Sequence, residues 1–170
     1  MAKAKNYINN KTLYTAIIEY RSKLEESIKN EIEKPVIPNY IAQSILLICN
    51  NLAMKPNFSG YSYKQDMISD AIVDCVAAVD KFNPDKTNNP FAYFTQIAWN
   101  AFLRRLDKEK RQTYIKHKNF ENTFLMNDWN ENESGQLKSN EFSSEIIKSY
   151  EKKLTNAKKS TKIAKNGLFI

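Results

Sequence analysis

The protein has 170 residues, which is enough for one domain with extensions but too few for two full hydrophobic cores. With 42% apolar and 26% charged residues it has the composition of a globular chain, and no apolar run is long enough to span a membrane. The 26 basic and 19 acidic residues give a net charge of +7, which favours a polyanionic partner such as nucleic acid over an acidic substrate.

Helical spacing of apolar residues predicts the first two helices. The first is expected over residues 10–28, where charged side chains surround an apolar stripe. Pro35 and Pro38 then interrupt the chain. The second helix is expected over residues 39–54, with Asn39 as its N-cap.

Two further helices are predicted after a connection at residues 55–62, which Phe58 and Tyr61 are expected to anchor to the core. The third helix is expected from about Tyr63 to Phe82. Asn89 and Pro90 have the residue types of an N-cap and a first helical position. The fourth helix is therefore expected to begin at Pro90 and to end near residue 113.

No strand-like alternation of useful length appears before residue 118, so the predicted fold class is all-α around one core. Residues 1–118 are expected to form this helical domain. Residues 119–154 are expected to be an acidic, extended segment with a possible short helix from Glu141, because six acidic residues and one basic residue occur between 120 and 145. Residues 155–170 are expected to be a basic, flexible tail that ends in apolar residues.

Few residues suit catalysis or metal binding. Cys49 and Cys75 lie in apolar helical patterns with no close partner in the sequence, which indicates buried, reduced thiols. His117 is the only histidine and lies among lysines. Only three glycines are present, too few to suggest the phosphate-binding loops of nucleotide enzymes. We therefore expect no enzyme, cofactor or metal site, and the N-terminus lacks the apolar core of an export signal.

The third predicted helix has a face that burial does not explain. Its core stripe leaves Asp66, Asp70, Val73, Asp74 and Ala77 on the opposite side. These residues form either an ordinary solvated face or a protein-docking surface on which a cationic partner packs over the small apolar side chains.

The fourth predicted helix has a polar face of a different kind. Aromatic, amide and basic side chains recur there at spacings of three and four residues. Residues 99–118 contain seven basic and two acidic side chains. Such a face suits nucleic acid, because rings stack on bases, amides bond base edges and cations neutralise phosphates. A basic, solvated helix end is the alternative. The side chains concerned are Tyr93, Gln96, Asn100, Arg104, Arg105, Lys108, Lys110 and Arg111.

The order of these motifs resembles region 2 of bacterial sigma factors. Residues 66–82, which end in Ala-Val-Asp-Lys-Phe, resemble region 2.2, and residues 90–94 with the basic helix behind them resemble regions 2.3 and 2.4. More specifically, residues 6–11 and 57–61, together with the start of the fourth helix, resemble the late-transcription sigma factors of T-even-type phages. The resemblance covers most of residues 5–118.

This resemblance implies a phage late sigma factor in the cytoplasm of the infected bacterial host. Such a protein binds the host RNA polymerase core, recognises an AT-rich, −10-like late promoter element and promotes strand opening. The resemblance implies that the third helix docks on the clamp helices of the largest polymerase subunit. The implied polymerase-binding residues are Asp66, Ser69, Asp70, Val73 and Val76.

The resemblance also implies roles on the fourth helix. Tyr93 matches the aromatic position that stacks on a flipped non-template adenine. Gln96, Asn100 and Arg104 match neighbouring DNA-facing positions. The implied DNA-binding set is Tyr93, Gln96, Asn100, Arg104, Arg105, Lys108 and Arg111.

The chain departs from primary sigma factors in two ways. Gln96 and Ile97 stand where those proteins have a pair of tryptophans, which implies weaker melting. No second helix-turn-helix follows the basic helix, so promoter anchorage is expected from a late co-activator and from the phage sliding clamp. The implied clamp-binding residues are the C-terminal Leu168, Phe169 and Ile170, although a terminus with no partner is the alternative.

The sequence is also compatible with functions other than transcription initiation. A helical DNA- or RNA-binding module, or a polymerase-binding regulator without initiation activity, would also explain the basic helix. A nucleic-acid-binding module alone leaves the acidic face and the apolar terminus unexplained.

Overall fold

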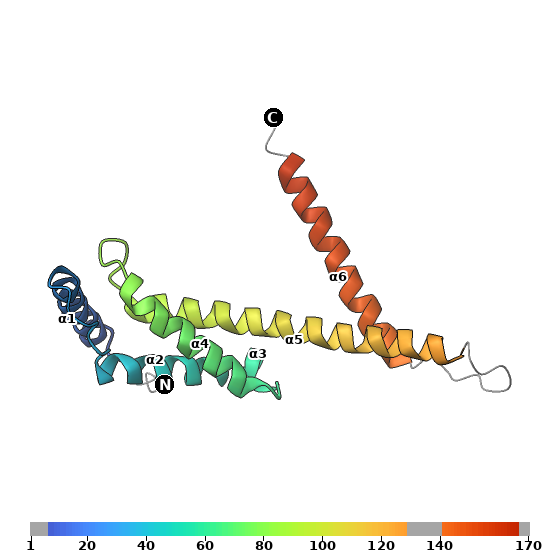
Figure 1. The fold of residues 1–170 in the computed structure, drawn as a ribbon, viewed down its shortest axis with the longest axis horizontal. Coiled ribbons are helices and arrows are strands. Elements are labelled where there is room, and N and C mark those ends of the chain that lie inside the picture. Colours follow the sequence, from blue (N-terminus) through green and yellow to red (C-terminus); the bar gives the residue numbers. More distant parts are fainter. Residues whose placement is uncertain (1–6, 129–140, 167–170) are drawn as a thin grey trace, which may run out of the picture. The chain divides into compact units, whose positions relative to one another are not determined.

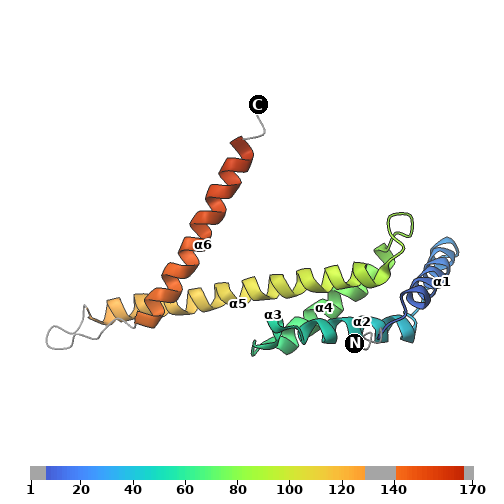
Figure 2. The same cartoon turned by 180° about the vertical axis from the view of Figure 1, so that it is seen from behind.

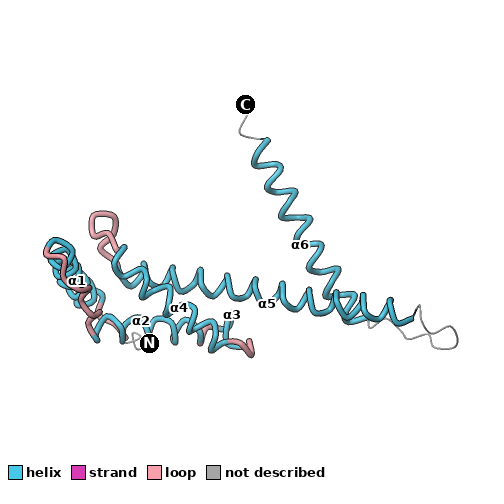
Figure 3. Tube along the Cα trace, in the orientation of Figure 1, coloured by secondary structure: helices cyan, strands magenta, loops and turns pink. Residues whose placement is uncertain are grey.

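The computed structural model describes residues 7–128 and 141–166, and every regular element in these ranges is a helix (Figures 1 and 3). The predicted all-α fold class is therefore confirmed for the described part of the chain. In the same part of the chain, no helix combines the length and the apolar character needed to cross a membrane.

Helix α1 (Asn10–Lys29) begins where the sequence predicts. The side chain of Asn9 caps it by accepting hydrogen bonds from the backbone N–H groups of Lys11 and Thr12. Leu13, Ile17 and Tyr20 are its buried residues. The Tyr20 hydroxyl bonds Asp80, which ties α1 to the end of the third predicted helix.

Helix α2 (Asn39–Ala53) contributes the most central apolar face. Its N-cap is Pro38 rather than the predicted Asn39. The reason is that the Pro38 carbonyl already accepts from the N–H groups of Ile41 and Ala42, so Asn39 lies inside the first turn. The buried residues of α2 are Ile41, Ser44, Ile45, Ile48, Cys49, Leu52 and Ala53.

The connection after α2 contains one short helix, α3 (Pro56–Ser59). Phe58 is buried and meets the rings of Trp99 and Phe102 edge-on, at centroid distances of 4.9 and 5.0 Å. The expected anchoring role of Phe58 is therefore confirmed. Tyr61 is half-buried and packs near the ring of Tyr63.

Helix α4 (Lys64–Ala78) is shorter than the predicted third helix. Its end tightens into a 3-10 turn, η1 (Val79–Lys81), and Phe82 is then extended ahead of the turn at Asn83 and Pro84. The apolar stripe of α4 packs against α2, and the two helices lie side by side in both views (Figures 1 and 2). Its buried residues are Met67, Ile68, Ala71 and Cys75.

Helix α5 (Pro90–Asp128) begins as predicted but extends well beyond residue 113. The Asn89 side chain accepts from the Ala92 N–H and confirms the predicted cap. No proline or glycine occurs between Pro90 and Asp128, so nothing in the sequence forces the helix to stop. Its core-facing residues are Phe94, Ala98, Ala101 and Phe102.

The chain divides into two compact units, which part inside α5 between Arg105 and Leu106. In the second unit, helix α6 (Glu141–Asn166) packs against α5. The rings of Tyr114 and Tyr150 stack at 4.6 Å, and His117 Nδ1 lies 3.0 Å from the Ser143 hydroxyl.

Residues 119–128 continue α5 and are helical rather than extended. The short helix that the sequence allows from Glu141 is present as the first part of α6. Likewise, residues 155–166 belong to α6 rather than to a flexible tail. The ring stack between α5 and α6 supplies tertiary stabilisation that acidic composition does not reveal. The predicted domain boundaries themselves stay a prediction.

Candidate functional site

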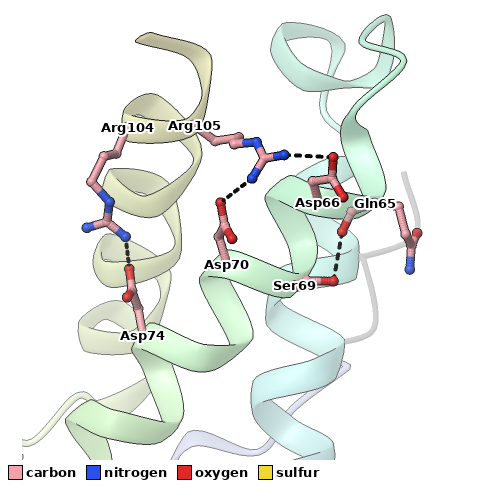
Figure 4. A network of polar contacts seen from close by, with 7 residues as sticks. All are labelled: Gln65, Asp66, Ser69, Asp70, Asp74, Arg104 and Arg105. Carbon is pink, nitrogen blue, oxygen red and sulfur yellow. Dashed lines mark hydrogen bonds and ion pairs between the residues drawn. The ribbon is translucent and has the colours of Figure 1, made fainter. Parts of the chain in front are cut away.

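The two unexplained faces of the sequence meet in the structure. The acidic row of α4 and the basic residues of α5 lie opposite each other and form a ladder of ion pairs (Figure 4). We call this the Asp–Arg ladder. It consists of Asp66, Asp70 and Asp74 on α4 and Arg104 and Arg105 on α5.

Arg105 forms the more enclosed part of the ladder. Its guanidinium lies between two carboxylates, with Nη2 at 2.8 Å from Asp66 Oδ2 and Nη1 at 3.2 Å from Asp70 Oδ2. Only 17% of its side chain is exposed. A planar guanidinium that bonds two carboxylates is held in one orientation, so Arg105 acts as a brace between α4 and α5.

Arg104 forms the open part of the ladder. Its Nη2 donates to Asp74 Oδ2, but 64% of the Arg104 side chain is exposed. Solvent screens such a pair, and exposed ion pairs contribute little to stability, about 0–1 kcal/mol. Arg104 and Arg105 are therefore not equivalent, although they are neighbours in the sequence.

The α4 face also presents apolar side chains to solvent. Val73 is 67% exposed and Val76 is 38% exposed, whereas valine is usually buried. Ser69 is exposed and its hydroxyl donates to the Gln65 carbonyl within the same helix. The face therefore combines carboxylates with uncovered valines, which suits a partner with cationic and apolar groups.

Tyr93 is more enclosed than the sequence suggested. Its hydroxyl donates to the Ala78 carbonyl at 3.1 Å, and its ring meets those of Phe82 and Phe94 edge-on, each at 5.2 Å. Burial raises the pKa of the Tyr93 phenol, with a smaller contribution from Cys75. The ring is thus anchored to the end of α4 and is half-buried.

Gln96 and Asn100 lie about one and about two turns further along α5, and both are exposed. Gln96 Nε2 donates to Asn100 Oδ1 at 3.1 Å, so the structure brings the two amides together as one polar pair. Their remaining donors and acceptors suit base edges or sugar and phosphate oxygens.

The other predicted residues lie elsewhere. Lys108 and Arg111 are exposed and belong to the second unit. Leu168, Phe169 and Ile170 lie outside the described residues.

Cys49 and Cys75 are buried free thiols, as predicted, but they are neighbours rather than isolated side chains. A hydrogen bond with Cys49, followed by burial, raises the pKa of the Cys75 thiol, which also lies 3.6 Å from the Phe94 carbonyl. Helix packing between α2 and α4 created this pair, which spacing in the sequence could not predict. Among the described residues, no group of three or more His, Cys, Asp or Glu side chains is arranged to hold a metal ion.

The pairing inside the Asp–Arg ladder was missed by the sequence analysis, which assigned the two faces to different partners. The available signal was charge complementarity: three aspartates repeat every four residues on one helix, and two arginines occur on the next. Which charges meet depends on how the helices cross, and the sequence pattern does not specify it.

Comparison with known families places this site in a recognised domain. The family model Sigma-70 region 2 matches residues 57–112, from α3 into α5. The match includes the whole Asp–Arg ladder, the exposed valines of α4 and the Tyr93 to Asn100 surface. No curated protein matches the chain.

Proposed function

Because residues 57–112 are a sigma-70 region 2 domain, we propose that this chain is a phage late sigma factor that directs the host RNA polymerase core to late promoters. Sigma region 2 domains bind the polymerase core and promoter DNA and take part in promoter melting, and they are transcription factor domains rather than enzymes. The late, phage-specific role rests on the resemblance of residues 6–11 and 57–61 to late sigma factors of T-even-type phages.

The exposed Val73 is the observation that carries the polymerase contact. It stands on the α4 face between the ladder carboxylates, in the matched domain, with two thirds of its surface uncovered. We assign the docking of the clamp helices to this face. The assigned residues are Asp66, Ser69, Asp70, Val73 and Val76.

The α5 face is assigned to the AT-rich promoter element. Exposed amides at Gln96 and Asn100 suit base and backbone contacts, and the ring of Tyr93 is assigned to capture of an unpaired base. Arg104, Lys108 and Arg111 are exposed and supply charge for phosphates. Arg105 contributes by bracing α5 against α4 rather than by reaching DNA.

Promoter anchorage is assigned to other proteins. The apolar residues Leu168, Phe169 and Ile170 follow a lysine-rich stretch of the sequence. We assign these residues to the phage sliding clamp and expect a late co-activator to complete the complex in the cytoplasm of the infected host.

The docking assignment is tested by replacing one exposed apolar side chain with a charged one. Val73→Glu should weaken binding to host core polymerase about ten-fold or more, because a charged group would replace an interface apolar one. Ile28→Glu on α1 is the matched control, since Ile28 is 69% exposed and lies outside the matched domain. Asp66 and Asp70 are poorer probes because they also hold Arg105. Equal core binding by both variants would contradict the assignment.

The late sigma role is tested by transcription in vitro with host core polymerase on supercoiled DNA that carries AT-rich late-type promoters. Specific initiation that depends on this protein is the expected result. Core binding without initiation would favour a polymerase-binding regulator instead. Absence of core binding would leave a helical nucleic-acid-binding module.

A further inference from the structure

Helix α2 has a second face that the core does not use. The helix packs against α1, α3 and α4, yet Tyr40, Leu46, Leu47 and Met54 remain exposed, Met54 at 67%. Tyr40, Leu47 and Met54 are seven positions apart, about two helical turns, so they form one row along the helix. We call these three residues the α2 row. The row precedes residues 57–112, which match the Sigma-70 region 2 family.

The sequence around the α2 row contains very few charges. Between Glu33 and Asp66 the only charged residues are Lys34, Lys55 and Lys64, although 26% of the whole chain is charged. The exposed face of a helix usually carries charged residues, whereas the centre of a protein interface is depleted of them and enriched in aromatic residues and methionine. The α2 row therefore has the composition of an interface centre rather than of a solvated surface.

Both ends of the α2 row carry positive potential. At one end, Lys64 Nζ lies 3.5 Å from Met54 Sδ, and Lys55 follows Met54 in the chain. At the other end, the first turn of α2 contains no acidic residue and no side chain caps it, so the positive end of the helix dipole near Tyr40 is not neutralised from within the helix. Charge complementarity therefore favours an acidic partner.

The backbone of α2 limits the shape of the partner. A helix offers no edge for strand addition, so an extended peptide would gain no main-chain hydrogen bonds there. A second helix with apolar residues at the same spacing of seven can pack along the row. A second copy of this chain is disfavoured, because pairing two α2 helices in either orientation brings positive ends together.

We propose that the α2 row is a docking surface for an acidic, amphipathic helix of a partner protein. The partner's apolar residues cover the row, and its carboxylates lie near Lys64 and the first turn of α2. The α4 face differs in charge, because its carboxylates and exposed valines suit a cationic partner. The two surfaces therefore select different partners, and the docking on α2 goes beyond the proposed function and does not rest on it.

The docking is tested with the full-length protein and a labelled synthetic peptide. The peptide is a stapled helix of about fifteen residues, the length of the row, with leucines at heptad spacing and glutamates on both flanks. A twin peptide has lysines in place of the glutamates. Fluorescence anisotropy at about 0.15 M salt, which screens distant charges, should show at least about ten-fold tighter binding of the acidic peptide. Equal binding of the two peptides, or no binding of the acidic one, would overturn the proposal.

Leu47→Gln tests whether the peptide occupies the middle of the row. The variant should bind the acidic peptide about ten-fold more weakly, because an amide replaces a central apolar group. Leu103→Gln on α5 is the matched control, since both leucines are 43% exposed, and it should change the affinity less than about two-fold. Equal losses in the two variants would show that the peptide does not dock on the row. Urea unfolding of each variant checks that the fold is retained.

Lys64→Gln tests the charge at the Met54 end of the row. It should weaken binding of the acidic peptide several-fold, because it removes the ammonium group beside the row. Lys23→Gln removes the same charge from an exposed position on α1 and should have a smaller effect. Equal effects would mean that only net charge attracts the peptide, which contradicts the proposed complementarity.

Sedimentation equilibrium distinguishes the proposed partner from a second copy. The unmodified protein and Leu47→Gln should both be monomers. A dimer of the unmodified protein that Leu47→Gln dissociates would assign the row to a second copy and overturn the proposed occupant. None of these measurements uses polymerase or promoter DNA, so failure of the α2 docking and failure of the proposed sigma role are distinguishable.

Discussion

Tyr20 and Asp80 are sixty positions apart in the sequence, yet the Tyr20 hydroxyl donates to Asp80 Oδ1 at 3.2 Å. Lys34 Nζ lies 2.6 Å from the other carboxylate oxygen of Asp80, and the Tyr20 hydroxyl is also 3.5 Å from the Pro35 carbonyl. One carboxylate thus ties α1 and the linker before α2 to the turn that ends α4. Burial, and next the negative charge of Asp80, raise the pKa of the Tyr20 phenol.

This contact predicts a pH-dependent effect of Tyr20→Phe. At about pH 8 the variant should lose about 1 kcal/mol of unfolding free energy, the usual contribution of one hydrogen bond. The native state keeps the phenol protonated above pH 10, where the unfolded state releases that proton, so the stabilisation falls as the pH rises through the native pKa. Urea unfolding at about pH 8 and about pH 11 should show a shrinking difference between the two proteins. A constant difference would be inconsistent with this contact.

Phe58→Ala is expected to destabilise the first unit by about 3–5 kcal/mol. The substitution leaves a cavity beside Trp99 and Phe102 and releases α3 from the core. Met54→Ala is a suitable control because Met54 is exposed, and its effect should stay within about 0.5 kcal/mol. The urea concentration at the midpoint of unfolding measures the destabilisation in each variant. Similar midpoints for the two variants would argue against Phe58 as an anchor.

The two arginines of the ladder are expected to contribute differently to the free energy of unfolding. Arg105→Ala should cost about 1–2 kcal/mol, because it leaves two carboxylates without their shared, largely buried partner. Arg104→Ala should cost less than about 1 kcal/mol, because its pair is exposed and screened. Chemical unfolding at low and high salt distinguishes them. A larger loss of unfolding free energy from Arg104→Ala than from Arg105→Ala would contradict the assignment of Arg105 as the brace.

Two substitutions at Tyr93 separate the role of its ring from the role of its hydroxyl group. Tyr93→Phe removes the hydrogen bond to the Ala78 carbonyl but retains the ring, whereas Tyr93→Ala removes both. Under the proposed function, stacking contributes about 1–3 kcal/mol per base, so promoter opening should fall about ten-fold or more in the alanine variant and change little in the phenylalanine variant. Permanganate reactivity of promoter thymines measures opening. Normal opening by Tyr93→Ala would exclude base capture by this residue.

Removal of residues 167–170 tests the proposed clamp contact. The truncated protein should support unassisted transcription as before and should lose only the stimulation that depends on the sliding clamp, because the deleted residues lie outside the matched domain. Transcription with and without clamp measures the difference. Undiminished stimulation would show that the terminus does not bind the clamp.

Much of the first unit could be predicted from the sequence because its helices have strong local signals. Asn89 with Pro90 marks the start of α5, and the apolar spacing of Ile68, Ala71 and Cys75 identifies the buried stripe of α4. The second unit was harder to predict. Its acidic composition suggested an extended chain, whereas the stack of Tyr114 on Tyr150 holds two helices together.

Hydrophobic periodicity and capping are local properties, so the start of most helices, the core residues and the two remaining faces could be inferred from the amino-acid sequence. The Asp–Arg ladder between those faces, the enclosure of Arg105 beside an exposed Arg104, and the contact of Cys49 with Cys75 became visible only in the folded chain. Such pairings depend on the angle and register at which α2, α4 and α5 cross. That geometry results from the packing of all their side chains together.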